Sequence, residues 1–392
     1  MVQQVKEAKR RGKKVAVGGP YVTSISQPCK AAGADYLILD EGEITLPMFV
    51  KALECGEESG VFRAEEKPDV TATPVPRYDL LEMNAYAMMS VQFSRGCPFQ
   101  CEFCDIIVLY GRKPRTKSPG QLLAELDRLF ELGWRGTIFM VDDNFIGNKR
   151  NVKLLLAELK PWMADKGYPF TFNTEASVDL AKDQDLMDAM VACNFGSVFV
   201  GIETPDEDSL AVTKKFQNTR DPLLESINKI QRSGIRVMAG FIIGFDGEKK
   251  GAGDRIVEFA EKAAIPLTLF SMLQALPDTA LSIRLKKEGR LLEAGGDINQ
   301  TTLMNFVPTR PIEDIAREFV DGFWRLYDPQ QFLDRTYRCY RILGQANFPK
   351  KEKKAKKPFN WHALKALFIV FTMQGIVRKT RWSFWFWQKY IT

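Results

Sequence analysis

Apolar runs alternate with amphipathic stretches through the middle of the chain. Between about residues 89 and 290, short runs rich in apolar and β-branched residues are separated by longer stretches with helical spacing, such as 119–132 and 152–164. The runs predicted as strands are 90–94, 137–141, 170–174, 197–203, 237–244 and 267–276. Six strand and helix units in series predict a parallel sheet or a partial barrel.

The flanking segments have different patterns. Two apolar runs near the start, 14–17 and 36–39, end in small or acidic residues, as strands of a doubly wound sheet do. A stretch rich in Pro, Glu and Lys follows, and amphipathic helices are expected at 312–327 and 331–343. The predicted parts are an N-terminal α/β segment, a linker, a barrel and a helical C-terminal domain with a basic, aromatic tail, at 1–60, 61–88, 89–290 and 291–392.

The expected fold class is therefore α/β. We expect a partial (β/α)6 barrel of the TIM type, preceded by a short Rossmann-like remnant and followed by a helical C-terminal extension.

Composition narrows the class of protein. The chain has 392 residues, and 55 Lys and Arg against 49 Asp and Glu give a net charge of +6, which does not indicate nucleic-acid binding. Seven cysteines without a secretory leader indicate a reducing cytoplasm and metal chemistry rather than disulfides. No run reaches the ~18 to 20 apolar residues that span a bilayer, so we expect a cytoplasmic protein.

Three cysteines stand close together after the first predicted strand of the barrel. Cys97, Cys101 and Cys104 have the spacing C-x3-C-x2-C. Three thiolates leave one iron of a four-iron cluster without a protein ligand, and such an open position can bind a cofactor directly. A zinc site would need a fourth ligand, and the one histidine, His362, lies far away in the sequence. The spacing therefore predicts a [4Fe-4S] cluster.

With Phe103 as its aromatic residue, the C-x3-C-x-aromatic-C loop resembles the signature of the radical S-adenosylmethionine (SAM) superfamily. The resemblance implies that SAM binds the open iron of the cluster. One electron from the reduced cluster then cleaves SAM to methionine and a 5′-deoxyadenosyl radical, which abstracts hydrogen from the substrate. It also implies an electron donor such as ferredoxin or flavodoxin.

The resemblance implies SAM contacts at the ends of the later strands. By residue type alone, other interpretations are open for these strand ends. The pair Asp142-Asp143 could be a solvated turn, and Glu203 could be part of a helix N-cap. The glycines at 240 and 244 could ease packing of the barrel. The segments 141–145, 201–204 and 240–245 follow the cysteine loop in the order that the family has them. The residues expected to position SAM are Phe103, Asp142, Asp143, Glu203, Gly240, Ile242 and Gly244.

Both ends of the chain resemble one branch of this superfamily. The segments 17–20 and 40–43 resemble the last third of the cobalamin-binding domain of B12-dependent members. The segment 328–335 is similar to a C-terminal domain in a branch that includes hopanoid C-2 methylases. The resemblance implies cobalamin-dependent methyl transfer to an unactivated carbon of a lipid, such as a hopanoid-like molecule, or of another small molecule.

Two features of the N-terminal part depart from that pattern. Only about sixty residues precede the linker, whereas a cobalamin domain has about 130 or more, and no nearby histidine offers a lower axial ligand. Three explanations stay open: a truncated or misassigned gene start, a partner chain that completes the domain, or loss of the corrinoid. The alternative functions are rearrangement, cyclisation or oxidation by a radical SAM enzyme without cobalamin, a non-catalytic iron–sulfur protein, or a truncated remnant.

The other cysteines and the tail have simpler interpretations. His362 is expected to be a packed or surface side chain. The lysine run at 350–357 has the composition of a solvated linker, but together with the aromatic segment 382–390 it also has that of an interfacial membrane anchor. The alternative for these aromatics is closure of the open side of the barrel. The cysteines expected to be small buried side chains are Cys29, Cys55, Cys193 and Cys339.

Overall fold

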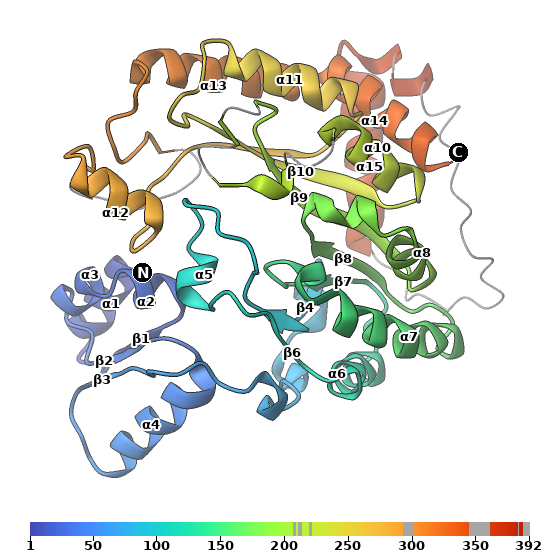
Figure 1. The fold of residues 1–392 in the computed structure, drawn as a ribbon. Helices are drawn as coiled ribbons and strands as arrows, with labels where there is room; N and C mark the ends of the chain where they lie inside the picture. The colour runs from blue at the N-terminus through green and yellow to red at the C-terminus, as the bar shows by residue number, and fades with distance from the viewer. Residues whose placement is uncertain are drawn as a thin grey trace.

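A six-stranded parallel sheet lies at the centre of the protein (Figure 1). In this computed structural model the strand order is β11-β10-β9-β8-β7-β4, so chain neighbours are sheet neighbours, and the predicted α/β fold is confirmed. The strands are β4 (Met88–Val91), β7 (Thr137–Met140), β8 (Thr171–Glu175), β9 (Phe195–Glu203), β10 (Arg236–Ile243) and β11 (Thr268–Met272). The structure describes residues 1–206, 209–210, 214–218, 222–292, 302–344, 361–382 and 384–386.

Two of the predicted strands have different ends in the structure. β4 ends at Val91 rather than at residue 94, because residues 94–95 leave the sheet and pair with another segment. β11 ends at Met272 rather than at residue 276. The chain turns after it through Pro277 and Asp278, and Asp278 has a left-handed φ of 59°.

Helices cover the sheet because their apolar faces complete its core. α6 buries Leu122, Leu126 and Leu129, which are spaced by four and three residues, and Ser118 with Gln121 forms a capping box at its start. The main hydrophobic core of the protein is a cluster of buried apolar side chains that includes residues of all six strands. The helices after the strands are α6 (Pro119–Glu131), α7 (Lys149–Asp165), α8 (Gln184–Ala192), α10 (Leu223–Arg232), α11 (Ala252–Lys262) and α12 (Ala280–Lys287).

A separate three-stranded parallel sheet forms the N-terminal lobe, drawn in blue in Figure 1. Its order is β1-β2-β3, and residues 60–62, which were placed at the boundary of the linker, form its third strand. Three short 3-10 helices between residues 70 and 85 then lead to β4. The elements of the lobe are α1 (Val2–Arg10), β1 (Ala16–Gly18), α2 (Pro20–Ser24), α3 (Gln27–Ala31), β2 (Tyr36–Ile38), α4 (Gly42–Glu54) and β3 (Gly60–Phe62).

The C-terminal part is helical, as predicted. α13 packs against α11 so closely that a Cβ at Gly253 would lie 2.6 Å from the carbonyl oxygen of Glu318. The bounds are α13 (Ile312–Leu326), α14 (Pro329–Leu343), α15 (Trp361–Thr372) and a π-helical turn (Met373–Val377). The lysine run at 350–357, the residues 387–390 of the aromatic segment and the side chain of His362 lie outside the described residues.

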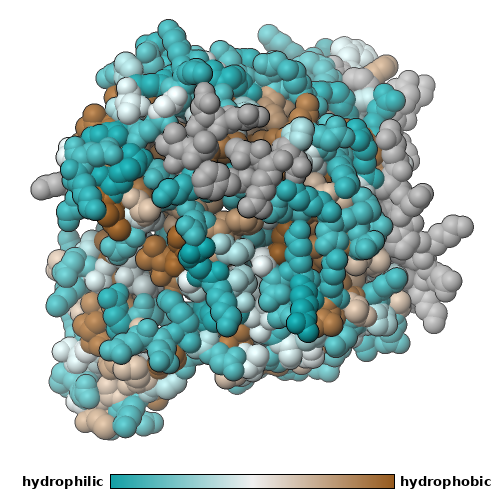
Figure 2. Space-filling model, in the orientation of Figure 1, coloured by the Kyte–Doolittle hydropathy of each residue, from teal (hydrophilic) through white to brown (hydrophobic). Residues whose placement is uncertain are grey.

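The four cysteines outside the loop were expected to be buried, and the structure confirms this for three of them. Cys29, Cys193 and Cys339 are buried as expected, but Cys55 is exposed, because it follows the last turn of α4 at the edge of the lobe. On the face shown in Figure 2 hydrophilic groups dominate, with apolar groups visible in the recesses. Within the described ranges, every helix is too short or too polar to cross a bilayer.

Candidate functional site

The three clustered cysteines lie on one closed loop. β5 (Ser94–Arg95) pairs with β6 (Arg115–Thr116), and the loop between them carries the cysteines and α5 (Ile106–Leu109). At the base of the loop Gly96 has a φ of 95°, and a Cβ there would lie 2.8 Å from the carbonyl oxygen of Gly111. The same oxygen accepts a hydrogen bond from the Cys97 N–H at 3.3 Å. Only glycine allows this close approach between the two ends of the loop.

Asp142 and Asp143, which follow β7, hold the start of the cysteine loop. The buried carboxylate of Asp142 accepts hydrogen bonds from the N–H groups of Phe93 and Ser94, both at 2.8 Å, and from the Ser94 hydroxyl at 2.6 Å. Asp143 is half-buried and accepts from the Gly96 N–H at 2.9 Å. Burial raises the pKa of Asp142 to about 7 and also raises the pKa of Asp143. Asp142 thus serves the backbone, while Asp143 is the better placed of the two to meet a ligand.

Two buried side-chain amides face the thiols. Gln217 Nε2 lies 3.6 Å from Cys101 Sγ, and Asn144 Nδ2 lies 3.9 Å from Cys97 Sγ. Both amide side chains belong to residues that are at most 5% exposed. N–H donors aimed at sulfur stabilise thiolate ligands and are among the groups that set the potential of an iron–sulfur cluster. The surroundings of the cysteines therefore fit such a cluster.

The thiols themselves resist ionisation without a cation. Burial raises the pKa of Cys97, and it raises the pKa of Cys104 to about 12. Iron would therefore have to displace protons from these groups on binding. In the part of the chain that the structure describes, no three Cys, His, Asp or Glu side chains surround the position of a single metal ion.

Glu203, at the end of β9, is paired beside the cysteine loop. It forms a buried ion pair with Lys215, whose Nζ lies 5.8 Å from the centre of the Phe103 ring. Although burial opposes its charge, attraction to Glu203 and Cys101 raises the pKa of Lys215. Glu203 has a left-handed φ of 65°, a strained conformation for a residue with a side chain. The contact of Glu203 with the SAM ribose stays a prediction.

The glycines at the end of β10 pack against side chains of the protein. A Cβ at Gly240 would lie 2.8 Å from the Phe199 ring, and one at Gly244 would lie 2.8 Å from the Met304 methyl group. Ile242 is half-buried between them. Packing therefore accounts for both glycines in the structure, and their contact with the SAM adenine stays a prediction.

Several side chains around the loop were missed by the sequence analysis. Glu175 ends β8, and burial together with repulsion from Asp143 raises its pKa to about 7. Its place at the carboxyl end of a parallel strand is a signal that could have found it. The same strand-end signal marks Asn144, which lies in the segment 141–145 after β7. No such signal marks Lys215 or Gln217, since their pairing depends on the tertiary fold.

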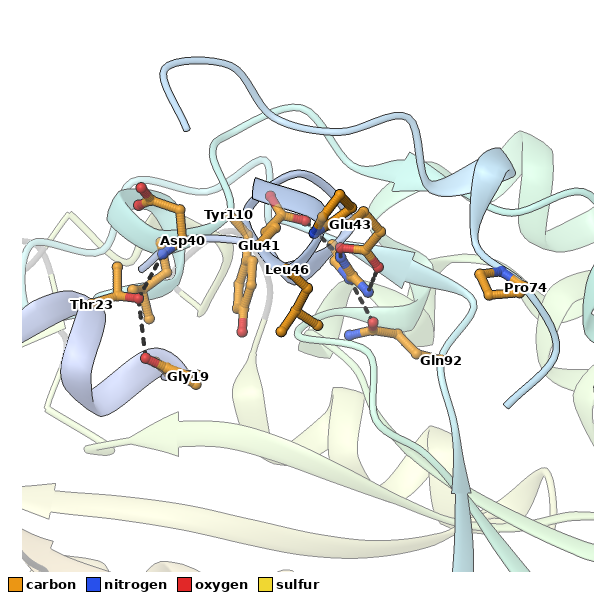
Figure 3. A pocket seen from close by; sticks show the side chains of 14 residues that line it. Gly19, Thr23, Asp40, Glu41, Glu43, Leu46, Pro74, Gln92 and Tyr110 are labelled. Carbon is orange, nitrogen blue, oxygen red and sulfur yellow. Dashed lines mark hydrogen bonds and ion pairs between the residues drawn. The ribbon is translucent and has the colours of Figure 1, made fainter. Parts of the chain in front are cut away.

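A pocket of about 570 Å³, which we call the interlobe pocket, lies between the N-terminal lobe and the cysteine loop (Figure 3). Gly19, Thr23 and the acidic segment after β2 line it from the lobe, and Arg95, Leu109 and Tyr110 line it from the loop. In Figure 3, Tyr110 and Leu46 lie between Gly19 and Thr23 on one side and Glu43 and Gln92 on the other. The carboxyl ends of parallel strands are where open α/β sheets bind ligands. The loop that carries the three cysteines thus also forms part of the wall of this pocket.

A network of four charged residues joins the lobe to the loop. Arg95 donates to Glu41 at 2.7 Å and to Glu43 at 2.7 and 2.9 Å, and Arg115 donates to the second oxygen of Glu41 at 2.7 Å. The Glu41 side chain is only 3% exposed. Paired guanidinium forks give such contacts a fixed geometry. We call Glu41, Glu43, Arg95 and Arg115 the interlobe clamp.

Replacing Gln217 by leucine should lower the reduction potential of the reconstituted cluster by tens of millivolts. The variant loses an N–H donor near Cys101, so the more electron-rich reduced state is stabilised less. A redox titration followed by electron paramagnetic resonance measures the shift. Gln231→Leu is the matched control, because Gln231 is also buried but donates to the carbonyl oxygen of Ala263. Equal reduction potentials in the wild type and in Gln217→Leu would contradict the assignment of Gln217 as a donor to a cluster ligand.

Comparison with known families matches two regions. Residues 91–260 match the radical SAM superfamily, and residues 279–391 match a domain of unknown function, DUF4070. The chain is 69% identical over 386 residues to an uncharacterised methyltransferase of Synechocystis sp., covering 98% of this chain and 71% of the relative. It is 36% identical over 376 residues to the hopanoid C-2 methylase of Rhodopseudomonas palustris, covering 95% and 70% of the two chains.

Solved structures share the fold at low sequence identity. The radical SAM methyltransferase TsrM from Kitasatospora setae, solved with cobalamin and a [4Fe-4S] cluster, has a TM-score of 0.62 at 18% identity and covers 84% of this chain and 75% of its own. The cobalamin-dependent radical SAM enzyme OxsB has a TM-score of 0.63 at 15% identity and covers 95% and 60%. These structures support the arrangement of lobe and barrel.

Proposed function

Because this chain belongs to the radical SAM superfamily, in the branch of the hopanoid C-2 methylase, we propose that it methylates an unactivated carbon with the help of cobalamin. The observation that carries the proposal is that the cysteines and part of the pocket lining lie on the same loop. Cys97 lies two residues after Arg95, which lines the interlobe pocket, and Leu109 and Tyr110 of the same loop line it too. The loop thus joins the place for a cluster to a pocket suited to a second cofactor.

The residues present fit the cluster, and we place cobalamin in the pocket beside it. Cys97, Cys101 and Cys104 would hold the cluster, with Gln217 and Asn144 as donors to two of its thiolates. Cobalamin would take the interlobe pocket, whose described lining includes the backbone of Gly19 and the side chains of Thr23 and Tyr110 and no histidine. When bound, the cluster supplies the electron that cleaves SAM, and cobalamin supplies the methyl group.

The chain's own side chains prepare the space around the cysteines. Asp142 fixes the strand end, Gly96 lets the loop close, and the ring of Phe103 packs at 5.7 Å on that of Phe245. Asp143 and Glu175 bring carboxylates to the ends of neighbouring strands, where the polar groups of SAM would be oriented.

The substrate we propose is an apolar small molecule of the lipid class. The support is the 36% identity to a protein named hopanoid C-2 methylase, which extends through the C-terminal part. Ferredoxin or flavodoxin is proposed as the electron donor. Small apolar substrates of this kind need radical chemistry because they carry no activated C–H bond.

Anaerobic reconstitution with iron, sulfide, SAM and dithionite tests the proposal. We expect about four irons per chain and formation of 5′-deoxyadenosine. Titration with hydroxocobalamin, followed by its visible spectrum, then tests the pocket, with Tyr110→Glu expected to weaken binding. Formation of 5′-deoxyadenosine without cobalamin binding would favour a rearrangement, cyclisation or oxidation. No iron and no 5′-deoxyadenosine would exclude the enzyme.

A further inference from the structure

The last described segment of the chain forms a hairpin with its own aromatic core. α15 runs into the π-helical turn, and residues 381–382 and 384–386 return against it. The rings of Phe371, Phe384 and Trp385 lie 5.3 to 5.7 Å apart, and Trp385 Nε1 donates to the carbonyl oxygen of Gly375 at 2.7 Å. These contacts give the segment a fixed shape. We call residues 361–382 and 384–386 the C-terminal hairpin.

The outer surface of the C-terminal hairpin is apolar and open. Trp361, Phe368, Ile376 and Trp382 are between 66% and 75% exposed. Four consecutive residues of α15, at 367–370, are all exposed, so apolar side chains project on every side of the helix rather than in one stripe. A helix that is apolar all round is normally buried in a core or in lipid. An exposed apolar surface of this kind marks an interaction site.

A groove of about 500 Å³ runs along α15. Trp361, Leu364, Leu367, Phe368 and Phe371 line it, and Lys365 stands at its edge. In Figure 1, the red end of the chain and the blue N-terminal lobe lie on opposite sides of the view. The end of the hairpin therefore lies apart from the N-terminal lobe.

Charge identifies the partner of this surface. Residues 361–392 contain no Asp or Glu, and residues 350–392 contain eleven Lys and Arg against one Glu, a formal charge of +10. Because the whole chain has a charge of +6, the remaining residues carry −4. Lys365, Arg378, Lys379 and Arg381 are all exposed, and within the described ranges none forms an ion pair. Four basic side chains and no acidic one therefore share the described hairpin with the apolar surface, and the flanking sequence is basic as well.

We propose that the C-terminal hairpin docks on an anionic lipid bilayer. Its apolar side chains would enter the boundary between headgroups and acyl chains, and its basic side chains would meet the anionic headgroups. Indoles such as those of Trp361 and Trp382 favour this boundary because they combine an apolar ring with an N–H donor. The mode is surface attachment, since α15 has 12 residues and spanning needs about 20. The proposal holds whatever the substrate of the enzyme is.

Flotation of the full-length protein with vesicles tests the proposal. We expect it to float with phosphatidylcholine vesicles that contain phosphatidylglycerol, to float poorly with phosphatidylcholine alone, and to bind more weakly at about 0.5 M salt. Phe368→Glu with Ile376→Glu should lower the partition coefficient about tenfold or more, since both side chains would carry charge into the boundary. Leu80→Glu, at an equally exposed position in the linker, is the matched control and should bind like the wild type.

Two results would overturn the proposal. One is that the wild type stays with the free protein at low salt in the presence of anionic vesicles. The other is that it elutes as a dimer that Phe368→Glu dissociates while vesicle binding is unchanged, which would assign the surface to a second copy of the chain. Because Phe368 and Ile376 are exposed, circular dichroism should show the same folded content in the variants as in the wild type.

Discussion

Replacing Cys101 by serine should abolish cluster assembly and with it SAM cleavage. Cys101 is the buried member of the three predicted ligands, and Gln217 faces its sulfur. Loss of a direct ligand should reduce 5′-deoxyadenosine formation by more than the about 100-fold that loss of an outer-shell partner causes. Iron content, the cluster absorbance and 5′-deoxyadenosine measure the effect.

The control for this prediction is another cysteine of the same chain. Cys55→Ser changes an exposed thiol at the end of α4, far along the chain from the loop, and should leave iron content and SAM cleavage as in the wild type. If Cys101→Ser still assembled about four irons per chain, the assignment of the ligands would be wrong.

Replacing Arg95 by alanine should separate the N-terminal lobe from the barrel. The variant leaves Glu43 without its partner and Glu41 with Arg115 alone, and uncompensated charge in a buried place costs about 3 kcal/mol of unfolding free energy. We place the loss at the lower end of the usual range because one pair of the interlobe clamp remains. Hydrogen exchange of β1 to β3 and chemical denaturation followed by circular dichroism measure it.

Two further variants separate the clamp from a general charge effect. Arg77→Ala removes a guanidinium that is 70% exposed and paired with Asp79, so the loss should stay below about 1 kcal/mol. Arg95→Lys keeps the charge but loses the planar fork and should fall between the other two. Equal stability of Arg95→Ala and Arg77→Ala would show that the interlobe clamp does not hold the lobe.

The order of the strands could be predicted because each strand has a run of apolar residues and each is followed by a helical stretch. The cysteine loop could be predicted because its three ligands lie within eight residues. Both patterns are local in the sequence.

The parts that were missed depend on contacts between distant residues. β5 and β6 have two residues each, too few to carry a period that could be recognised. β3 has only Val61 and Phe62 as apolar residues and stands next to the stretch rich in Pro, Glu and Lys, so it was not separated from the linker. Gln217 meets Cys101 across 116 residues, and Arg95 meets Glu41 across 54. Asp142 was expected to meet SAM because it ends a strand, but only the structure shows that backbone N–H groups occupy its oxygens.

The loop that Gly96 and Gly111 close has one more consequence. It carries the cysteines on one stretch and Leu109 with Tyr110, which line the interlobe pocket, on another. A molecule that fills the pocket would restrain this loop. The loop would then have less conformational entropy left to lose when a cluster is assembled on its cysteines. Thermodynamic linkage makes such an effect reciprocal, so loading of either centre should tighten the other. The protein would then fill its two centres cooperatively.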